Sequence, residues 1–262
     1  MFEPADPATA AALARLYDLD LVEDPGDLDL YLALADRVGE PILELAAGSG
    51  RLAVPLAAAG HRVTAVDIDP AMLERAARYG REAGVLEDRL ELVEADLRTL
   101  ALPGAGTYRL AFIGLNSILL LADRQDQRRA VQVLADHLAP GGLAVVDVWL
   151  PDAEDLARFD GRVLLEWPRS DPETGAIVTK AGSAQHDAAT GTVVLTAIYE
   201  EGGQGEPARR WVRRDRLRLL GAYELASFAE EAGLRVELLA GGHDLEPFGP
   251  GAERAVLIAE RP

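Results

Sequence analysis

The stretch PILELAAGSGRLAVPLAAAG, from Pro41 to Gly60, decides the fold. It opens with an apolar run that includes Glu44, passes through Gly48 and Gly50, and continues as an alanine-rich segment. This order predicts a buried strand, a glycine loop and a helix. Glycines in such a loop let the backbone pass close to a ligand, and the helix N-terminus adds free N–H groups. The stretch therefore predicts a ligand-binding loop at the carboxyl edge of a sheet.

The segments around this stretch continue the alternation of strands and helices. Two helices are expected before it, within residues 7–18 and 26–38, and Asp6 and Pro7 suit the cap and first position of the first one. Strands are expected at 62–68, 89–96, 108–116 and 143–150, with helices at 70–84 and 125–139. Strands that alternate with helices predict parallel βαβ units and a doubly wound α/β sheet.

The pattern changes between Arg162 and Leu220, where four strand-like segments follow one another without helices. The first joint is DPETG and the second is DAATG, and both begin with Asp and end with Gly. Such joints favour tight turns followed by a residue with positive φ, as hairpins use. We therefore expect an antiparallel insertion. A helix and two final strands follow it, and these strands should pair antiparallel because no helix separates them.

Composition narrows the class of protein. The 262 residues carry a formal charge of −18 and contain no cysteine. Disulfides, thiolate nucleophiles and cysteine-ligated metals are excluded, and the acidic surface argues against a nucleic-acid partner. The sequence has neither a basic, apolar leader nor a run of 18 apolar residues. We expect an unprocessed cytoplasmic protein with no membrane partner.

Three acids fall at the expected carboxyl edge of the sheet: Glu44, Asp67 and Asp96. The glycine loop with Asp67 also matches a dinucleotide fingerprint, so a nicotinamide-dependent oxidoreductase is one alternative. Glu44 argues against it, because a second negative charge beside a pyrophosphate is unfavourable whereas a cationic ligand would be attracted. Asp96 adds a third acid, and the closing hairpin stands where another βαβ unit would be expected.

Taken in order, LELAAGSGR, VTAVDIDPAML, LVEADLRTL, AFIGLNSILLL and GGLAVVDVW resemble the motifs of class I S-adenosylmethionine-dependent methyltransferases. The rest of the chain is similar to bacterial small-molecule methyltransferases of secondary metabolism, including sugar N-methyltransferases. The resemblance implies a Rossmann-like, seven-stranded sheet with helices on both faces. It implies four regions: an N-terminal helical lid (1–39), a cofactor-binding core (40–160), an antiparallel β insertion over the substrate site (161–220), and a C-terminal helix with the closing hairpin (221–262).

The resemblance also implies roles for individual residues. Asp67 would accept both ribose hydroxyls of S-adenosylmethionine, Asp96 the adenine amino group, and Asn116 would lie beneath the methyl group. Ala46 replaces the first glycine of the family motif, and Tyr17 and Tyr31 resemble lid tyrosines. The full set of expected cofactor contacts is Tyr17, Tyr31, Glu44, Ala46, Gly48, Gly50, Arg51, Asp67, Ile68, Met72, Asp96, Leu97, Leu115 and Asn116.

The expected reaction is methyl transfer to N or O of a small molecule, without a metal. His186 and His243 are candidate bases because imidazole titrates near neutrality, and Arg218 is a candidate for the acceptor pocket. His137 is expected at the surface. A non-methylating reaction such as a cyclisation stays open because fold does not fix function, as does a non-catalytic binding module. An exposed edge strand of the insertion could also form a homodimer.

Overall fold

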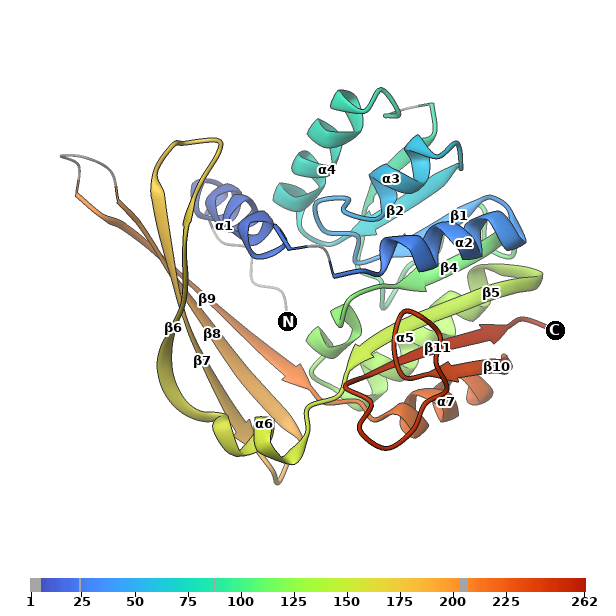
Figure 1. Cartoon of the computed structure of the whole chain (residues 1–262). Coiled ribbons are helices and arrows are strands. Elements are labelled where there is room, and N and C mark those ends of the chain that lie inside the picture. The colour runs from blue at the N-terminus through green and yellow to red at the C-terminus, as the bar shows by residue number, and fades with distance from the viewer. Residues whose placement is uncertain (1–5, 24, 87, 203–206) are drawn as a thin grey trace.

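The computed structural model describes residues 6–23, 25–86, 88–202 and 207–262. Within them the chain forms a seven-stranded sheet flanked by helices and a separate four-stranded sheet (Figure 1). The large sheet has the order β10-β11-β5-β4-β1-β2-β3. Its strands are β1 (Ile42–Leu45), β2 (Val63–Asp67), β3 (Leu90–Glu94), β4 (Tyr108–Ile113), β5 (Leu138–Trp149), β10 (Arg235–Ala240) and β11 (Arg254–Glu260).

Strands β1 to β5 are parallel, and the closing hairpin is antiparallel. Ile42 of β1 lies opposite Val63 of β2 on one side and Leu110 of β4 on the other. β11 runs antiparallel to both β5 and β10, as expected for two final strands without a helix between them. The arrangement confirms the predicted Rossmann-like sheet with an antiparallel closing hairpin.

Helices cover both faces of this sheet, and every residue of β1 is buried as a result. Ile42 packs on the face covered by α2 (Leu28–Val38) and α3 (Ala53–Ala58). Leu43 packs on the other face with α5 (Arg124–His137) and α7 (Ala222–Glu231). α4 (Pro70–Glu82) contacts β2, β3 and α3. The 3-10 helix η1 (Ser117–Leu120) follows β4.

The four strands of the insertion form an antiparallel meander. They are β6 (Asp160–Ser170), β7 (Ile177–Asp187), β8 (Thr192–Gly202) and β9 (Arg209–Arg218). Gly175 and Gly191 end the first two turns with φ of 71° and 63°. Asp171 and Asp187 open these turns, and each side chain accepts a backbone N–H two residues on. The turn prediction is therefore confirmed. The short helix α6 (Ala153–Arg158), which carries a capping box, precedes β6 and was not predicted.

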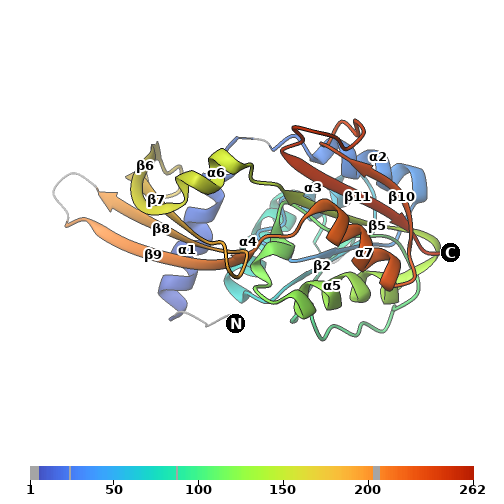
Figure 2. The same ribbon diagram turned by 90° about the horizontal axis from the view of Figure 1, so that it is seen from below.

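Helix α1 (Pro7–Asp20) lies between the insertion and the core (Figures 1 and 2). Its Leu16 and Leu19 are buried with Val178 and Tyr199 of the insertion. α1 also contacts α4 of the core. The helix is thus packed on both sides. None of the helices among the described residues is long and apolar enough to cross a membrane.

Candidate cofactor and acceptor site

The loop between β1 and α3 lies at the carboxyl edge of the large sheet and lines a cavity. Ala46, Gly48 and Gly50 all have positive φ, at 58°, 56° and 84°. A Cβ on Gly48 would meet nothing within 4 Å, so this residue faces open space. A Cβ on Gly50 would stand 3.1 Å from the side chains of Ala76 and Val54. Gly48 therefore suits the ligand, whereas Gly50 is needed for close packing of the loop on α4 and α3.

The cavity is bounded by α1, the glycine loop and the end of β4. Its lining residues are Tyr17, Leu21, Glu44, Ala46, Ala47, Gly48, Ser49, Arg51, Leu52, Gly114, Leu115 and Ser117. Six of the expected cofactor contacts, namely Tyr17, Glu44, Ala46, Gly48, Arg51 and Leu115, thus lie together around this cavity. The polar members come from α1, β1, the glycine loop and η1, which meet only in the folded chain.

Glu44 is the buried acid of this cavity. Its side chain is 4% exposed, and Oε2 has no hydrogen-bond partner among the described residues. Burial raises its pKa to about 8, although the Arg51 guanidinium acts in the opposite direction. A buried oxygen without a partner is costly unless a ligand satisfies it. The site therefore fits a ligand that brings a donor, and a cationic donor best of all.

Asp67 is fixed at the end of β2. Its Oδ2 accepts the N–H of Gly48 at 2.7 Å, and its Oδ1 accepts the N–H of Asp69 at 2.9 Å. Burial raises its pKa. Each oxygen keeps a further lone pair, so the carboxylate can still accept from a diol. Ile68 follows at 37% exposure, an apolar side chain beside the acid, while Met72 is buried in α4.

Asp96 lies at the neighbouring strand end and binds a cation of the chain. Its carboxylate accepts from Nε and Nη2 of Arg98, which also contacts Asp126. Arg98 lowers the pKa of Asp96. The expected contact with an adenine amino group would therefore share this carboxylate with Arg98. Leu97 is half-buried between them.

The two expected lid tyrosines have different surroundings. Tyr17 of α1 lines the cavity, with Arg213 of β9 5.8 Å from its ring centroid. Tyr31 of α2 is fully buried against Phe112, and its hydroxyl has no hydrogen-bond partner among the described residues. Burial raises the pKa of both phenols. Tyr31 is not one of the residues that line the cavity, but its hydroxyl would lie 3.5 Å from a Cβ on the lining residue Gly114.

Several residues that tie the site together were not predicted. Asp18 of α1 accepts from Ser49 Oγ at 2.6 Å, from Arg75 Nε at 2.5 Å and from Tyr79 at 2.7 Å. Arg51 binds the fully buried Asp27 through two hydrogen bonds of 2.6 and 2.7 Å. These pairs join α1 and the start of α2 to the glycine loop.

The ends of β4 and β5 hold a second polar cluster. Leu115 and Asn116 have φ of 44° and 68°. Asn116 Oδ1 accepts from the backbone N–H of Trp149 and from Arg254 Nη1. Asp147 is fully buried on β5 and contacts His243 Nε2 at 3.0 Å and Arg254 Nη1 at 2.7 Å. Asp147 could have been noticed as the one charged residue inside the apolar run LAVVDVWL.

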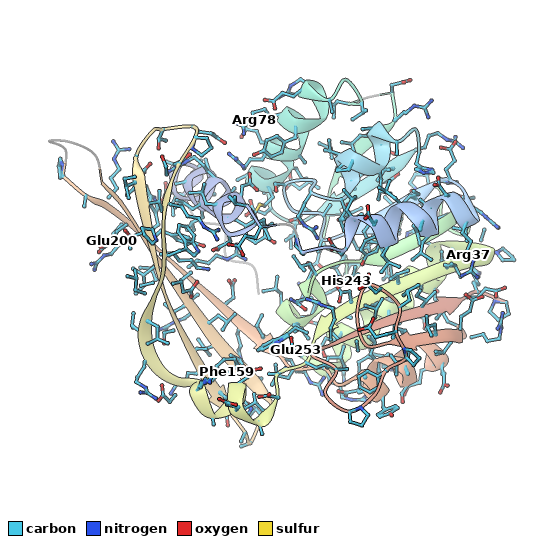
Figure 3. The ribbon with its side chains drawn as sticks, in the orientation of Figure 1. Arg37, Arg78, Phe159, Glu200, His243 and Glu253 are labelled. Carbon is cyan, nitrogen blue, oxygen red and sulfur yellow. The ribbon has the colours of Figure 1, made fainter. Side chains whose placement is uncertain are left out.

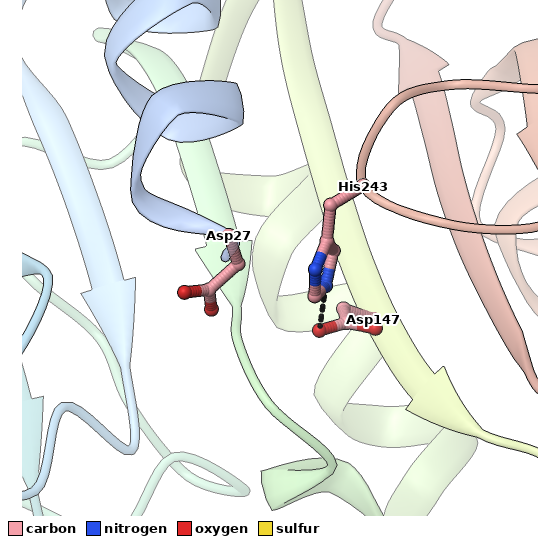
Figure 4. A group of neighbouring side chains, drawn as sticks. All are labelled: Asp27, Asp147 and His243. Atoms are coloured by element: carbon pink, nitrogen blue, oxygen red, sulfur yellow. Dashed lines mark hydrogen bonds and ion pairs between the residues drawn. The ribbon is translucent and has the colours of Figure 1, made fainter. Parts of the chain in front are cut away.

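Ligand atoms of Asp27, Asp147 and His243 all lie within 4.8 Å of one another (Figure 4). Such a group could hold a metal ion. Here Arg51 and Arg254 already neutralise the two carboxylates. A divalent cation would be placed beside two guanidinium groups, which is unfavourable. We therefore interpret the group as an ion-pair cluster.

The other candidate residues lie at the margins of the insertion or in the core. Arg218 binds Glu224 of α7 and Gln127 of α5, so its guanidinium ties the end of β9 to two helices. His186 is half-buried near the end of β7, and its backbone N–H donates to Phe159. Figure 3 shows Phe159 beside α6 at the base of the insertion, and His243 in the core.

The prediction that His137 lies at the surface was wrong. Its side chain is 2% exposed. Its Nδ1 donates to the Val133 carbonyl at 2.7 Å and its Nε2 accepts the N–H of Leu102 at 3.2 Å. The two bonds let a neutral imidazole be buried without an unsatisfied nitrogen.

Residues 42–142 match the family described as a methyltransferase domain. The chain is 26% identical over 228 residues to the cypemycin N-terminal methyltransferase of a Streptomyces species, covering 85% of this chain and 84% of that protein. The CcbJ methyltransferase of Streptomyces caelestis has a TM-score of 0.77 at 22% identity, covering 97% and 98% of the chains. The sugar N-methyltransferase KedS8 of Streptoalloteichus sp ATCC 53650 has a TM-score of 0.72 at 22% identity, covering 94% and 92%.

The strand order, the acidic residues at the edge of the sheet and these matches all indicate a methyltransferase. The chain is an S-adenosylmethionine-dependent methyltransferase. The cofactor is S-adenosylmethionine, and its cationic amino-acid end fits a cavity lined by Gly48 and by Glu44, whose Oε2 has no hydrogen-bond partner within the described part of the chain.

Proposed function

We propose that this methyltransferase transfers the methyl group to an amine nitrogen of a small molecule, in secondary metabolism. The names of the cypemycin N-terminal methyltransferase and of KedS8 both specify nitrogen as the acceptor. Charge supports the same choice, because a net charge of −18 attracts a cationic amine to the enzyme.

The observation that carries the proposal is the charge balance on the side of the insertion that faces α1. Lys180 and Tyr199 of this side donate to Asp20 of α1 at 2.8 and 2.7 Å, which fixes the orientation of the sheet. Lys180 also binds Glu166 at 2.9 Å. Arg213 binds Asp215 at 2.7 Å. The cations in the middle of this side are thus matched by carboxylates, so it suits a neutral or cationic acceptor better than an anionic one.

The residues of the chain would act by holding and orienting. S-adenosylmethionine supplies a methyl group that its sulfonium already activates. Gly48 admits the amino-acid part, Glu44 accepts from its ammonium group, and Asp67 accepts from the ribose hydroxyls. An amine attacks only as the neutral base, in line with the bond that breaks. Enclosure by α1 and the insertion would exclude water from that step.

We also propose a proton acceptor for the amine. Asp147 binds Nε2 of His243 and so fixes the ring, which leaves Nδ1 as the free nitrogen. His186 and Arg218 remain proposed acceptor-site residues on the insertion. Loss of the His243 imidazole, in His243→Gln, should lower kcat, and the loss should shrink at high pH, where the amine arrives as the neutral base. An unchanged pH profile of kcat would remove His243 from this role.

The direct test uses the purified enzyme, S-adenosylmethionine and matched pairs of small amines and their hydroxyl analogues, including amino sugars and peptides with a free N-terminus. Formation of S-adenosylhomocysteine and the mass of the product are measured together. We expect amines, and not their hydroxyl analogues, to gain one methyl group. Methylation of hydroxyls alone would assign O as the acceptor. A new product formed without S-adenosylhomocysteine and without added methyl mass would favour a non-methylating reaction such as a cyclisation.

A further inference from the structure

The backbone after β4 has a conformation that L residues rarely adopt. Leu115 and Asn116 are consecutive and both left-handed, with φ of 44° and 68°. Leu115 lines the cofactor cavity together with Gly114 and Ser117. Asparagine tolerates this conformation better than most residues, but leucine does not. Two strained residues in a row persist only where the surrounding structure determines them.

The contacts that determine this conformation converge on Asn116. Its backbone N–H donates to the Asp147 carbonyl at 3.1 Å. Its side-chain Oδ1 accepts from the backbone N–H of Trp149 and from Arg254 Nη1, the latter at 3.3 Å. The segment is therefore tied to β5 by both its backbone and its side chain.

Arg254 is in turn held by a buried charge. The same Nη1 lies 2.7 Å from Oδ1 of Asp147, whose side chain is fully buried. The other carboxylate oxygen is bound by His243. Arg254 begins β11, directly opposite Trp149 of β5. Arg254, in the closing hairpin, thus contacts Asn116, which follows Leu115 in the wall of the cofactor cavity.

We propose that Asp147 and Arg254 are positioning residues of the methyl-transfer site. They hold Asn116, and through it Leu115, in the left-handed conformation that shapes the wall of the cavity beside the donor. Neither residue lines the cavity. Their loss should therefore misplace the wall without removing any side chain that lines the cavity. The inference rests on the methyl-transfer function proposed above.

Arg254→Gln is the first variant. We expect kcat to fall about 10- to 100-fold, as for a displacement of about 1 Å at a reacting centre, while the Kd for S-adenosylhomocysteine changes by less than about threefold. Hydrogen exchange of the peptide covering residues 114–119 should become faster. Arg254→Lys keeps a donor and should recover part of kcat. The matched control is Arg235→Gln, which removes an exposed ion pair with Glu260 on the same hairpin and should change none of these quantities.

A second pair of variants separates positioning from folding. Asn116→Gly removes the side chain but adopts positive φ without strain, whereas Asn116→Ala removes the same bonds and keeps the strain. We expect Asn116→Ala to lose clearly more kcat than Asn116→Gly. In the Asn116→Gly background, Arg254→Gln should cost less than in the native chain, because the bond that it removes no longer exists.

Several outcomes would overturn the proposal. A kcat within twofold of the native value in a folded Arg254→Gln, or equal activity of Asn116→Ala and Asn116→Gly, would show that the network does not position the wall. Unchanged exchange at 114–119 would do the same. If the native enzyme methylates no amine, the proposed acceptor is wrong, and the exchange and Kd measurements on the same variants still decide whether Asp147 and Arg254 hold this segment.

Discussion

At the scale of single residues, Glu44 is the acid whose protonation we expect to change when the cofactor binds. It sits on a fully buried strand, and its Oε2 has no partner among the described residues. Burial raises its pKa from 4.5 to about 8, so the free enzyme holds it as the neutral acid at pH 7. A bound ammonium group would favour the carboxylate. Cofactor binding and loss of this proton are therefore linked.

We predict that binding of S-adenosylmethionine releases a proton below pH 8. Affinity should rise by up to about tenfold per pH unit as the pH approaches 8, because less work is then needed to ionise Glu44. Titration calorimetry in two buffers of different ionisation enthalpy measures the released proton. Glu44→Gln, which cannot ionise, is the matched control and should show no release. Proton uptake by the native enzyme would contradict the assignment.

A second prediction concerns Asp67. Asp67→Ala should weaken S-adenosylmethionine by about 2–4 kcal/mol, because two charge-assisted bonds to a diol are lost. The variant also leaves the N–H of Gly48 without its partner at 2.7 Å, so the glycine loop should loosen. Asp67→Asn keeps one acceptor oxygen and should lose less. The Kd for S-adenosylmethionine, measured by calorimetry, tests this prediction. Equal affinity of Asp67→Ala and the native enzyme would place the ribose elsewhere.

The residues that sequence reasoning found and those it missed differ in how far apart their partners lie in the chain. Asp67 ends β2 and Gly48 lies in the loop after β1, so their place at the sheet edge follows from local order. Asp147 and Arg254 are 107 positions apart and meet only because β11 pairs with β5. His137 was misjudged because its partners, Val133 and Leu102, are backbone groups that no side-chain pattern reveals.

At the scale of elements, the strands and long helices were predictable because their apolar periods are regular. The residues at which these elements begin and end were less predictable. The helix was expected to end at residue 139 and the next strand to begin at 143. Instead, residues 138–142 already form the start of β5, and Gly141 has φ of 74°. Helix α2 buries Leu30 and Leu34, whereas Leu32 is only partly buried. The docking of α1 was not predictable, since its three partners at Asp20 come from three strands of the insertion.

The contact of α1 with the insertion gives the next prediction. Asp20 accepts from Trp167 Nε1 at 3.0 Å, and also from Lys180 and Tyr199. Asp20→Ala should lower the free energy of unfolding by about 2 kcal/mol, because partly buried donors lose a shared acceptor. Cofactor affinity should fall too, since Tyr17 and Leu21 line the cavity. The matched control is Glu23→Gln, whose exposed pair with Arg169 should contribute little. Thermal unfolding and calorimetry test both effects, and a variant that matched the control in both would show that Asp20 does not anchor α1.

At the scale of the whole molecule, helix α1 connects the four-stranded insertion to the core, because it packs against both. One side of this helix packs on Val178 and Tyr199 of the insertion. Its Asp18 binds Ser49 of the glycine loop and Arg75 of α4. Glu173, in the turn between β6 and β7, binds Arg75 and Arg78, which lower its pKa to about 2. The insertion therefore contacts the cofactor-binding core directly through this turn and indirectly through α1.

This connection changes what removal of the insertion should do. If residues 160–218 are replaced by a short Gly/Ser linker, α1 loses the apolar partners of Leu16 and Leu19, and Asp20 loses its three donors. We expect turnover to disappear and cofactor affinity to weaken, because Tyr17 is no longer held over the cavity. A second variant that also lacks residues 1–21 separates the two causes. If α1 acts only while the insertion holds it, both variants should bind S-adenosylhomocysteine equally, as calorimetry would measure. Native affinity in the first variant would show that α1 stays closed without the insertion, and native turnover would place the acceptor elsewhere. The mass in solution, measured on the same samples, would reveal whether the insertion also joins two copies of the chain.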